Sequence, residues 1–86
     1  MYLLVTKITV QLPRGLQARN TTTFVYKARS FSSDVTLTKR NDSSNGKEIM
    51  KVMDLNVNNG DEVTLYVNGV DEKISMDTLK NFLLNK

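Results

Sequence analysis

The sequence predicts an α+β domain in which an antiparallel sheet has helices over one face. Most segments expected to be strands alternate apolar and polar residues, so each has a single apolar face. Two longer segments carry apolar residues at helical spacing, and turn-prone sequences separate the segments. A chain of 86 residues suits one domain, expected to span residues 1–86.

The first strand and the first helix are expected before residue 32. Apolar and polar residues alternate over residues 4–12, which is the period of a half-buried strand, and Pro13 and Gly15 then open a loop. Residues 17–31 are expected to form a helix, because their apolar members fall near one helical stripe. These members are Ala18, Phe24, Val25, Ala28 and Phe31.

The second half of the chain holds the clearest elements. Residues 34–39 alternate again, and the polar residues 40–46 are expected to hold a short edge strand. Residues 48–55 are expected to make one to two helical turns. Residues 62–67 are the clearest strand and residues 71–84 the clearest helix. The expected order is therefore β-α-β-(β)-α-β-α, which suits an α+β domain.

Composition excludes several kinds of chemistry. The chain has no cysteine and no histidine, which rules out disulfides, zinc sites built from these residues and histidine bases. No metal or cofactor is expected. The charge of +3 comes from basic residues without a dense run, which indicates a solvated surface and no direct contact with nucleic acid. The apolar stretch 2–5 is too short for a signal or a membrane span, so we expect a cytoplasmic protein.

Three short blocks of sequence carry a resemblance to a known family. They read RGLQARN at 14–20, KEIMKVMDL at 47–55, and GDEVTL at 60–65 followed by GVDE at 69–72. In this spacing they resemble the HPr family, the small phosphocarrier proteins of the bacterial sugar phosphotransferase system, nearly end to end. The resemblance implies an open-faced β-sandwich, a four-stranded antiparallel sheet with three helices on one face.

The departures from the family pattern fall on its two phosphorylation positions. The family's phosphorylatable histidine falls on Gln17, and its regulatory serine falls on Glu48. The arginine that would hold the phosphate is kept as Arg19, whereas the following proline is replaced by Asn20. In having Gln at the histidine position, the chain resembles the Crh branch of the family, although that branch keeps the serine. The chain is therefore identified as a divergent Crh-like member.

The loop around Gln17 is expected to have lost carrier chemistry. A Gln amide nitrogen is not nucleophilic at neutral pH, although Gln imitates the hydrogen bonding of an imidazole. Arg19 is interpreted either as a contact for an anion or a partner's carboxylate, or as a solvated arginine, and the residues leave this open. Asn20 is a good N-cap residue, so the helix is expected to begin later and the loop to be less rigid than in a working carrier.

The segment from Glu48 onward is the second candidate site. Glu48 is interpreted either as a permanent, partial mimic of phosphoserine or, as we favour, as an ordinary acid in the first turn of a helix. Val52 and Leu55 are expected to face inward. That leaves a partly outward docking patch of Ile49, Met50 and Met53.

The expected function is that of a non-enzymatic, regulatory protein-docking module related to carbon catabolite repression or to the phosphotransferase system. The resemblance implies a CcpA-like transcription regulator or a phosphotransferase-system enzyme as the partner. Lys51 adds a bulky charge where the family has glycine, which bears against the usual partner set. The oligomeric state and the pathway are left open, and no contact with a membrane is expected.

The residues bear differently on four other functions. A phosphocarrier that uses another residue is disfavoured, because the loop holds no suitable nucleophile. A carrier paralogue without function and a small nucleic-acid-binding α+β domain stay open as alternatives. A small hydrolase is disfavoured, because the available carboxylates resemble caps and turn ends. These carboxylates belong to Asp54, Asp61, Glu62, Asp71 and Glu72.

Overall fold

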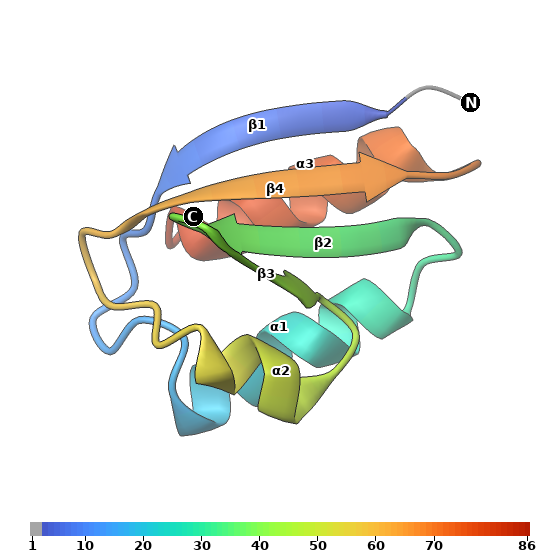
Figure 1. Cartoon of the computed structure of the whole chain (residues 1–86). Coiled ribbons are helices and arrows are strands. Elements are labelled where there is room, and N and C mark those ends of the chain that lie inside the picture. Colours follow the sequence, from blue (N-terminus) through green and yellow to red (C-terminus); the bar gives the residue numbers. More distant parts are fainter. Residues whose placement is uncertain (1–2) are drawn as a thin grey trace.

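A four-stranded antiparallel sheet with helices on one face makes up the computed structural model, which describes residues 3–86 (Figure 1). Met1 and Tyr2 lie outside the described residues, and with them part of the apolar stretch 2–5. In chain order the elements are β1 (Leu4–Thr9), α1 (Ala18–Arg29), β2 (Asp34–Lys39), β3 (Asp42–Asn45), α2 (Ile49–Asp54), β4 (Glu62–Asn68) and α3 (Glu72–Leu83). This order confirms the expected one, and the expected edge strand is β3.

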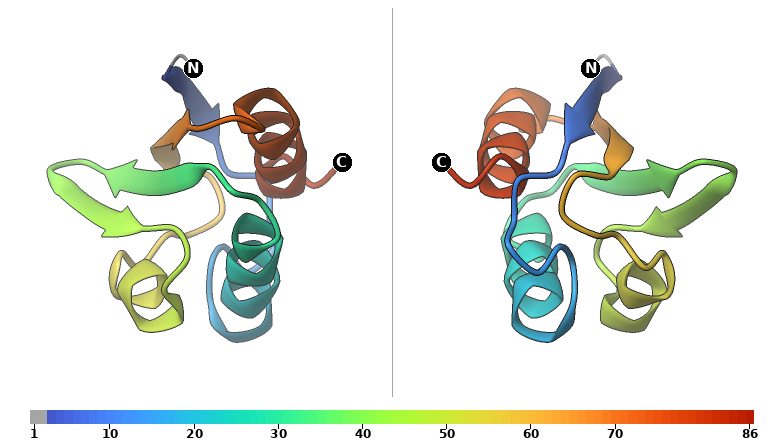
Figure 2. Two further views of the ribbon diagram at one scale, coloured as in Figure 1. Left: turned by 90° about the vertical axis from the view of Figure 1, so that its right-hand side faces the viewer. Right: turned by 90° about the vertical axis from the view of Figure 1, so that its left-hand side faces the viewer.

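The strands lie in the order β1-β4-β2-β3, with antiparallel pairing at every step. The short polar strand β3 and the longer strand β1 are therefore the two edges. Seen end-on, the helices lie on one side of the sheet and the other side is open (Figure 2). The predicted fold class is confirmed.

Alternating burial explains the two central strands. Val63, Leu65 and Val67 of β4 are almost fully buried, and the residues between them are half-buried on the open face. Val35 and Leu37 of β2 repeat this pattern. The apolar faces of these strands meet the helices and form the core.

Several expected boundaries were wrong by a few residues. Strand β1 ends at Thr9 and not at residue 12, although Val10 and Leu12 are still buried. After the strand, the backbone of Gln11 bonds to the carbonyl of Leu83 in α3, 2.8 Å away. Val10 also bonds to the backbone of Gly60 and Asp61, so contacts with α3 and with the segment before β4 hold this stretch after β1 has ended.

Helix α1 also differs from its expected bounds. It ends at Arg29, so Phe31 lies beyond it and is half-buried, while Ala18 at its start is exposed. Three apolar residues of the expected stripe are fully buried: Phe24, Val25 and Ala28. The expected apolar stripe was thus right for the middle of the helix, whereas Ala18 and Phe31 at its two ends are not buried.

Two segments distant in sequence meet beside α1 and α2, which lie side by side (Figures 1 and 2). The backbone N–H of Leu16 donates to the carbonyl of Val57 at 2.9 Å. The loop before α1 is therefore fixed against the loop after α2, and this contact positions the candidate site. Within residues 3–86 no helix has the length and apolar character needed to cross a membrane.

Candidate functional site

The loop that leads into α1 lines a shallow depression at one end of the molecule. Its lining residues are Arg14, Gln17, Ala18, Arg19 and Asn20. Gly15 shapes this loop, because its φ of +57° is in the left-handed region. A Cβ at Gly15 would lie 2.2 Å from the carbonyl oxygen of Val57, so only glycine permits this approach.

Asn20 lies inside helix α1 and bonds back to the loop, which corrects the expectation of a later helix start. Helix α1 begins at Ala18, and Asn20 lies within its first turn. The side-chain amino group of Asn20 donates to the carbonyl of Gly15 at 2.9 Å. Ala18 has a φ of +37°, an unfavourable value for a residue with a Cβ. The surrounding contacts therefore hold a strained helix start.

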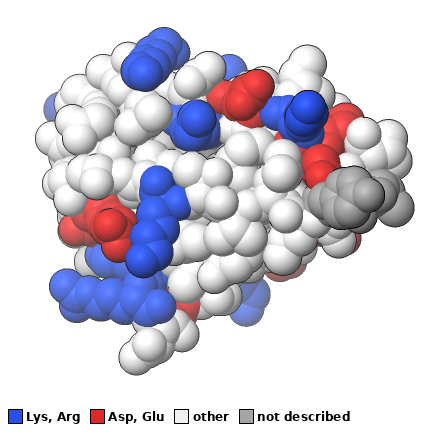
Figure 3. All heavy atoms as spheres, turned by 90° about the horizontal axis from the view of Figure 1, so that it is seen from above, with Lys and Arg blue, Asp and Glu red and all other residues white. Residues whose placement is uncertain are grey.

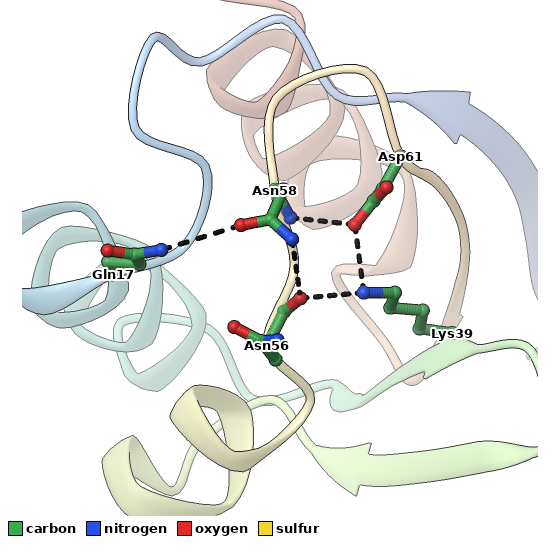
Figure 4. A network of polar contacts seen from close by, with 5 residues as sticks. All are labelled: Gln17, Lys39, Asn56, Asn58 and Asp61. Atoms are coloured by element: carbon green, nitrogen blue, oxygen red, sulfur yellow. Dashed lines mark hydrogen bonds and ion pairs between the residues drawn. The ribbon is translucent and has the colours of Figure 1, made fainter.

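Gln17 is the N-cap residue of α1, exposed and in an extended conformation. Its side chain makes no capping bond to α1. Instead, Nε2 of Gln17 donates to Oδ1 of Asn58 at 3.4 Å, across 41 positions of sequence. Figure 4 shows that this contact continues through Asn58 into a small polar network.

The rest of that network involves a loop carboxylate and a lysine from β2. Asp61 accepts the backbone N–H of Asn58 at 2.8 Å and pairs with Lys39 at 2.8 Å. Lys39 also donates to the carbonyl of Asn56 at 2.6 Å. The hydrogen bond from Lys39, followed by the one from the Asn58 backbone, lowers the pKa of Asp61. Asp61 therefore stays ionised and keeps the loop in this shape.

Glu48 lies at the other end of α2 from this network. It is the N-cap residue of α2, so the expectation that it lies in the first helical turn was wrong by one position. Its side chain makes no capping bond. The neighbouring carbonyl of Lys47 accepts a hydrogen bond of 2.7 Å from Arg29, at the C-terminal end of α1. Because α2 separates the two, the structure does not bring Glu48 together with Gln17.

Helix α2 exposes the three residues of the expected docking patch to different extents. Val52 and Leu55 are buried as expected, with 0% and 8% of their surface exposed. Met50 is 67% exposed and Met53 is half-buried. Ile49 is partly buried and packs against the core, which agrees with its expected partly outward position. Met50 is therefore the most exposed apolar side chain of α2.

Lys51 follows Met50 and is exposed. The hydroxyl of Ser44 in β3 donates to the backbone carbonyl of Lys51 at 2.7 Å, which joins α2 to the edge strand. Arg19 is exposed at the other helix. Met50 and Lys51 are thus both exposed on α2, and Arg19 is exposed at the N-terminus of the adjacent helix α1.

The carboxylates considered for hydrolysis do not converge. Asp61 and Glu62 lie where β4 begins, whereas Asp71 and Glu72 follow its far end. A strand of seven residues spans about 23 Å, so the two pairs are well separated. Over residues 3–86, no three carboxylates come close enough to hold a metal ion. These positions favour structural roles for the carboxylates.

Charge on the face seen from above is mixed. Figure 3 shows basic and acidic side chains interspersed around a broad uncharged area on that face. Nucleic-acid binding usually needs a continuous basic patch. This face therefore does not favour the nucleic-acid alternative.

Some residues of the site were not identified from the sequence. Arg14 was noted only as part of the loop motif, and Asn58 was not singled out. Asp61 was considered only as a carboxylate, and Lys39 only as the end of a strand. The single available signal was the polar turn at residues 58–61, and nothing in it indicates that it contacts Gln17.

Comparison with known sequences finds similarity to proteins of one family. The family model described as "PTS HPr component phosphorylation site" matches residues 4–85. The "HPr-like protein Crh" of Bacillus subtilis (strain 168) is 43% identical over 77 residues, which are 90% of this chain and 91% of that protein. The "Phosphocarrier protein HPr" of Buchnera aphidicola subsp. Baizongia pistaciae is 29% identical over 88% of this chain and 89% of that protein.

Comparison with solved structures shows the same similarity. The phosphocarrier protein HPr from Bacillus anthracis str. Ames superposes with a TM-score of 0.92 and 30% identity, over 94% of this chain and 96% of that one. A crystal structure of the Bacillus subtilis protein Crh, described as a dimer with a swapping domain, gives a TM-score of 0.78 and 41% identity. That match covers 93% of this chain and 92% of the other.

Proposed function

This chain belongs to the HPr family, and on that premise we propose that it is a regulatory protein-docking module that carries no phosphoryl group and is not an enzyme. The docking surface comprises the loop residues Gln17 and Arg19 and the α2 residues Met50 and Met53, with Ile49 and Glu48 at its margin. A CcpA-like transcription regulator or an enzyme of the phosphotransferase system is the partner class. The chain would work in the cytoplasm, which the absence of cysteine from so small a domain favours.

The exposure of Met50 is the observation that carries this proposal. A methionine that is 67% exposed on a short helix is a flexible apolar group without an internal packing role. Arg19 on the adjacent helix supplies a planar cation that can grip a carboxylate in two places. Such a pairing of an apolar anchor with an arginine is typical of the few residues that dominate protein interfaces.

The loss of carrier chemistry is supported by the loop itself. Gln17, the residue that the resemblance places at the histidine position, has a carboxamide that cannot form the labile bond of a phosphohistidine. The depression beside it is lined by two arginines and three residues without a nucleophilic side chain. We therefore expect no acid-labile phosphate on the chain after incubation with phosphoenolpyruvate and the general phosphotransfer enzymes.

The test of docking uses two matched surface substitutions. Met50→Asp places a charge at the centre of the proposed surface. Val70→Asp places one at an apolar residue that is 80% exposed between β4 and α3, outside that surface. Each variant and the unmodified chain are titrated calorimetrically with a CcpA-type regulator and with enzyme I.

The proposal expects binding to at least one of these proteins by the unmodified chain and by Val70→Asp. For Met50→Asp it expects at least about a tenfold loss, the effect of removing a strong interface anchor. Equal affinities of the two variants would place the docking surface elsewhere. No binding to either protein would reject both partner classes, and phosphorylated chain in the first assay would contradict the loss of carrier chemistry.

A further inference from the structure

The carbonyl group of Asn56 sets the direction of the hydrogen bonds in the network beside Gln17. A backbone carbonyl can only accept hydrogen bonds. This one accepts from Lys39 Nζ at 2.6 Å and from Asn58 Nδ2 at 3.3 Å. The amino group of the Asn58 side chain therefore faces Asn56, and its oxygen Oδ1 must point the other way.

The orientation of the Asn58 side chain determines the orientation of the Gln17 carboxamide. Oδ1 of Asn58 is an acceptor, so the group of Gln17 that faces it must be the amino group, and the observed contact is Nε2 to Oδ1 at 3.4 Å (Figure 4). The carbonyl oxygen Oε1 of Gln17 then lies on the side of the carboxamide away from Asn58. The bond is long and exposed, so its main consequence is orientation and not stability.

The backbone of Asn58 is fixed independently of its side chain. Its N–H donates to Asp61 at 2.8 Å, and Asp61 pairs with Lys39 at 2.8 Å. Lys39 is therefore bonded both to Asp61 and to the Asn56 carbonyl. Two separate contacts thus hold the loop in the position that lets Asn58 reach Gln17.

We propose that Asn58 is a positioning residue, which turns the carboxamide of Gln17 so that Oε1 is offered as a hydrogen-bond acceptor to the docking partner. This rests on the proposed docking function. The partner supplies a donor at this point, and the donor is a neutral N–H or hydroxyl group. Arg14 and Arg19 line the same depression, and their like charge disfavours a partner's cation.

Nuclear magnetic resonance of the free protein tests the orientation without any partner. Gln11 and Gln17 are the only glutamines in the chain, so the side-chain amide signals of Gln11 serve as an internal reference. We expect one Gln17 amide proton to exchange more slowly and to show a smaller temperature coefficient than those of Gln11. The Asn58→Ala variant should remove this difference, while Asn59→Ala at the neighbouring exposed residue should keep it. Identical behaviour of Gln17 and Gln11 in the unmodified chain would overturn the proposal.

A double-mutant cycle then tests the consequence for docking, with the CcpA-type regulator or enzyme I as the probe. Gln17→Met and Asn58→Ala should each weaken binding by about two- to tenfold, the effect of one neutral hydrogen bond. The double variant should lose little more than Gln17→Met alone, because Asn58 acts through Gln17. A loss for Gln17→Met with none for Asn58→Ala would refute the positioning role and leave the docking function intact. If neither protein binds the unmodified chain, the docking function fails and the proton-exchange comparison alone decides the orientation.

Discussion

The side-chain amino group of Asn20 donates a hydrogen bond of 2.9 Å to the backbone carbonyl of Gly15. This bond closes the loop at the start of α1, where Ala18 has a positive φ. Asn20→Ala would leave that carbonyl without this donor, so we expect a loss of about 1 kcal/mol in the free energy of unfolding. Urea denaturation measures it, and hydrogen exchange should rise in the loop at residues 14–17. Unchanged exchange in the loop would show that Asn20 is not what holds it.

The hydrogen bond between Asn20 and Gly15 affects whether a Gln17→His variant can be phosphorylated. A looser loop would have allowed little phosphoryl transfer even in Gln17→His. Because Asn20 fixes Gly15, we expect Gln17→His to acquire acid-labile phosphate from phosphoenolpyruvate through enzyme I, since an imidazole nitrogen is a competent nucleophile. The double variant Gln17→His/Asn20→Ala should acquire it more slowly. A Gln17→His protein that folds but stays unphosphorylated would show that the loop geometry of a carrier is lost here.

Alanine substitutions at two glycines should distinguish the cost of a steric clash from the cost of backbone strain. Gly15 and Gly60 both have positive φ, +57° and +90°. A Cβ at Gly60 would meet nothing within 4 Å, whereas one at Gly15 would collide with Val57. Gly60→Ala should therefore cost about 1–2 kcal/mol from strain alone. Gly15→Ala should cost clearly more, above about 3 kcal/mol. Equal effects in thermal unfolding would show that the loop moves away from the added methyl group.

The stability of the fold should depend on Asp71 in acid. Its carboxylate accepts hydrogen bonds from the hydroxyl of Ser33 and from the backbone of Ser32 and Ser33, which joins the segment between α1 and β2 to the start of α3. The Ser33 hydroxyl, followed by the Ser32 backbone, lowers the pKa of Asp71 below 3.8. A lowered folded-state pKa stabilises the fold above the usual pKa, and this stability is lost as the pH falls through the lowered value.

Asp71→Asn should therefore flatten the acid limb of the stability curve below about pH 4. The free energy of unfolding at a series of pH values measures the effect. Asp77→Asn is the matched control, because Asp77 is exposed on the same helix α3. If the two variants lose stability with acid in the same way, the acid sensitivity has another source, of which Asp61 is the next candidate.

Periodicity predicted the elements in which one face is buried against the helices or the sheet. Val63, Leu65 and Val67 alternate, and Met76, Leu79 and Leu83 recur at helical spacing, so β4 and α3 were placed within a residue at each end. The end of β1 was misplaced, because Val10 stays buried and bonded to the backbone of Gly60 and Asp61 after the strand register has ended at Thr9. Burial alone does not tell where hydrogen bonding between strands stops.

The candidate site was predictable only where a resemblance to known motifs supplied it. Gln17 and Arg19 were chosen from a local motif, and the structure places both in one depression. The contact of Gln17 with Asn58 spans 41 positions and depends on how two loops pack. The role of Asn20 was misjudged for another reason: its partner, the backbone of Gly15, is only five residues away, but the N-cap preference of Asn does not predict that pairing.

Three substitutions in the docking surface should weaken binding to different extents. Met50→Ala should weaken binding to the natural protein partner by more than about 1 kcal/mol, because a desolvated apolar anchor is worth that much at an interface. Arg19→Ala should follow, because its guanidinium can hold a carboxylate in two places. Glu48→Gln should cost about 0–1 kcal/mol, the typical value of an exposed charge contact.

The position of Glu48 supports this order. It is exposed at the N-cap of α2 and its side chain makes no capping bond, so its substitution removes only an exposed charge. A phosphoserine mimic would reverse the order, because the partner would then bind the carboxylate and Met50 would be peripheral. Titration calorimetry of the three variants with a CcpA-type regulator separates the two cases, since abolished binding for Glu48→Gln together with a mild effect of Met50→Ala would establish the mimic.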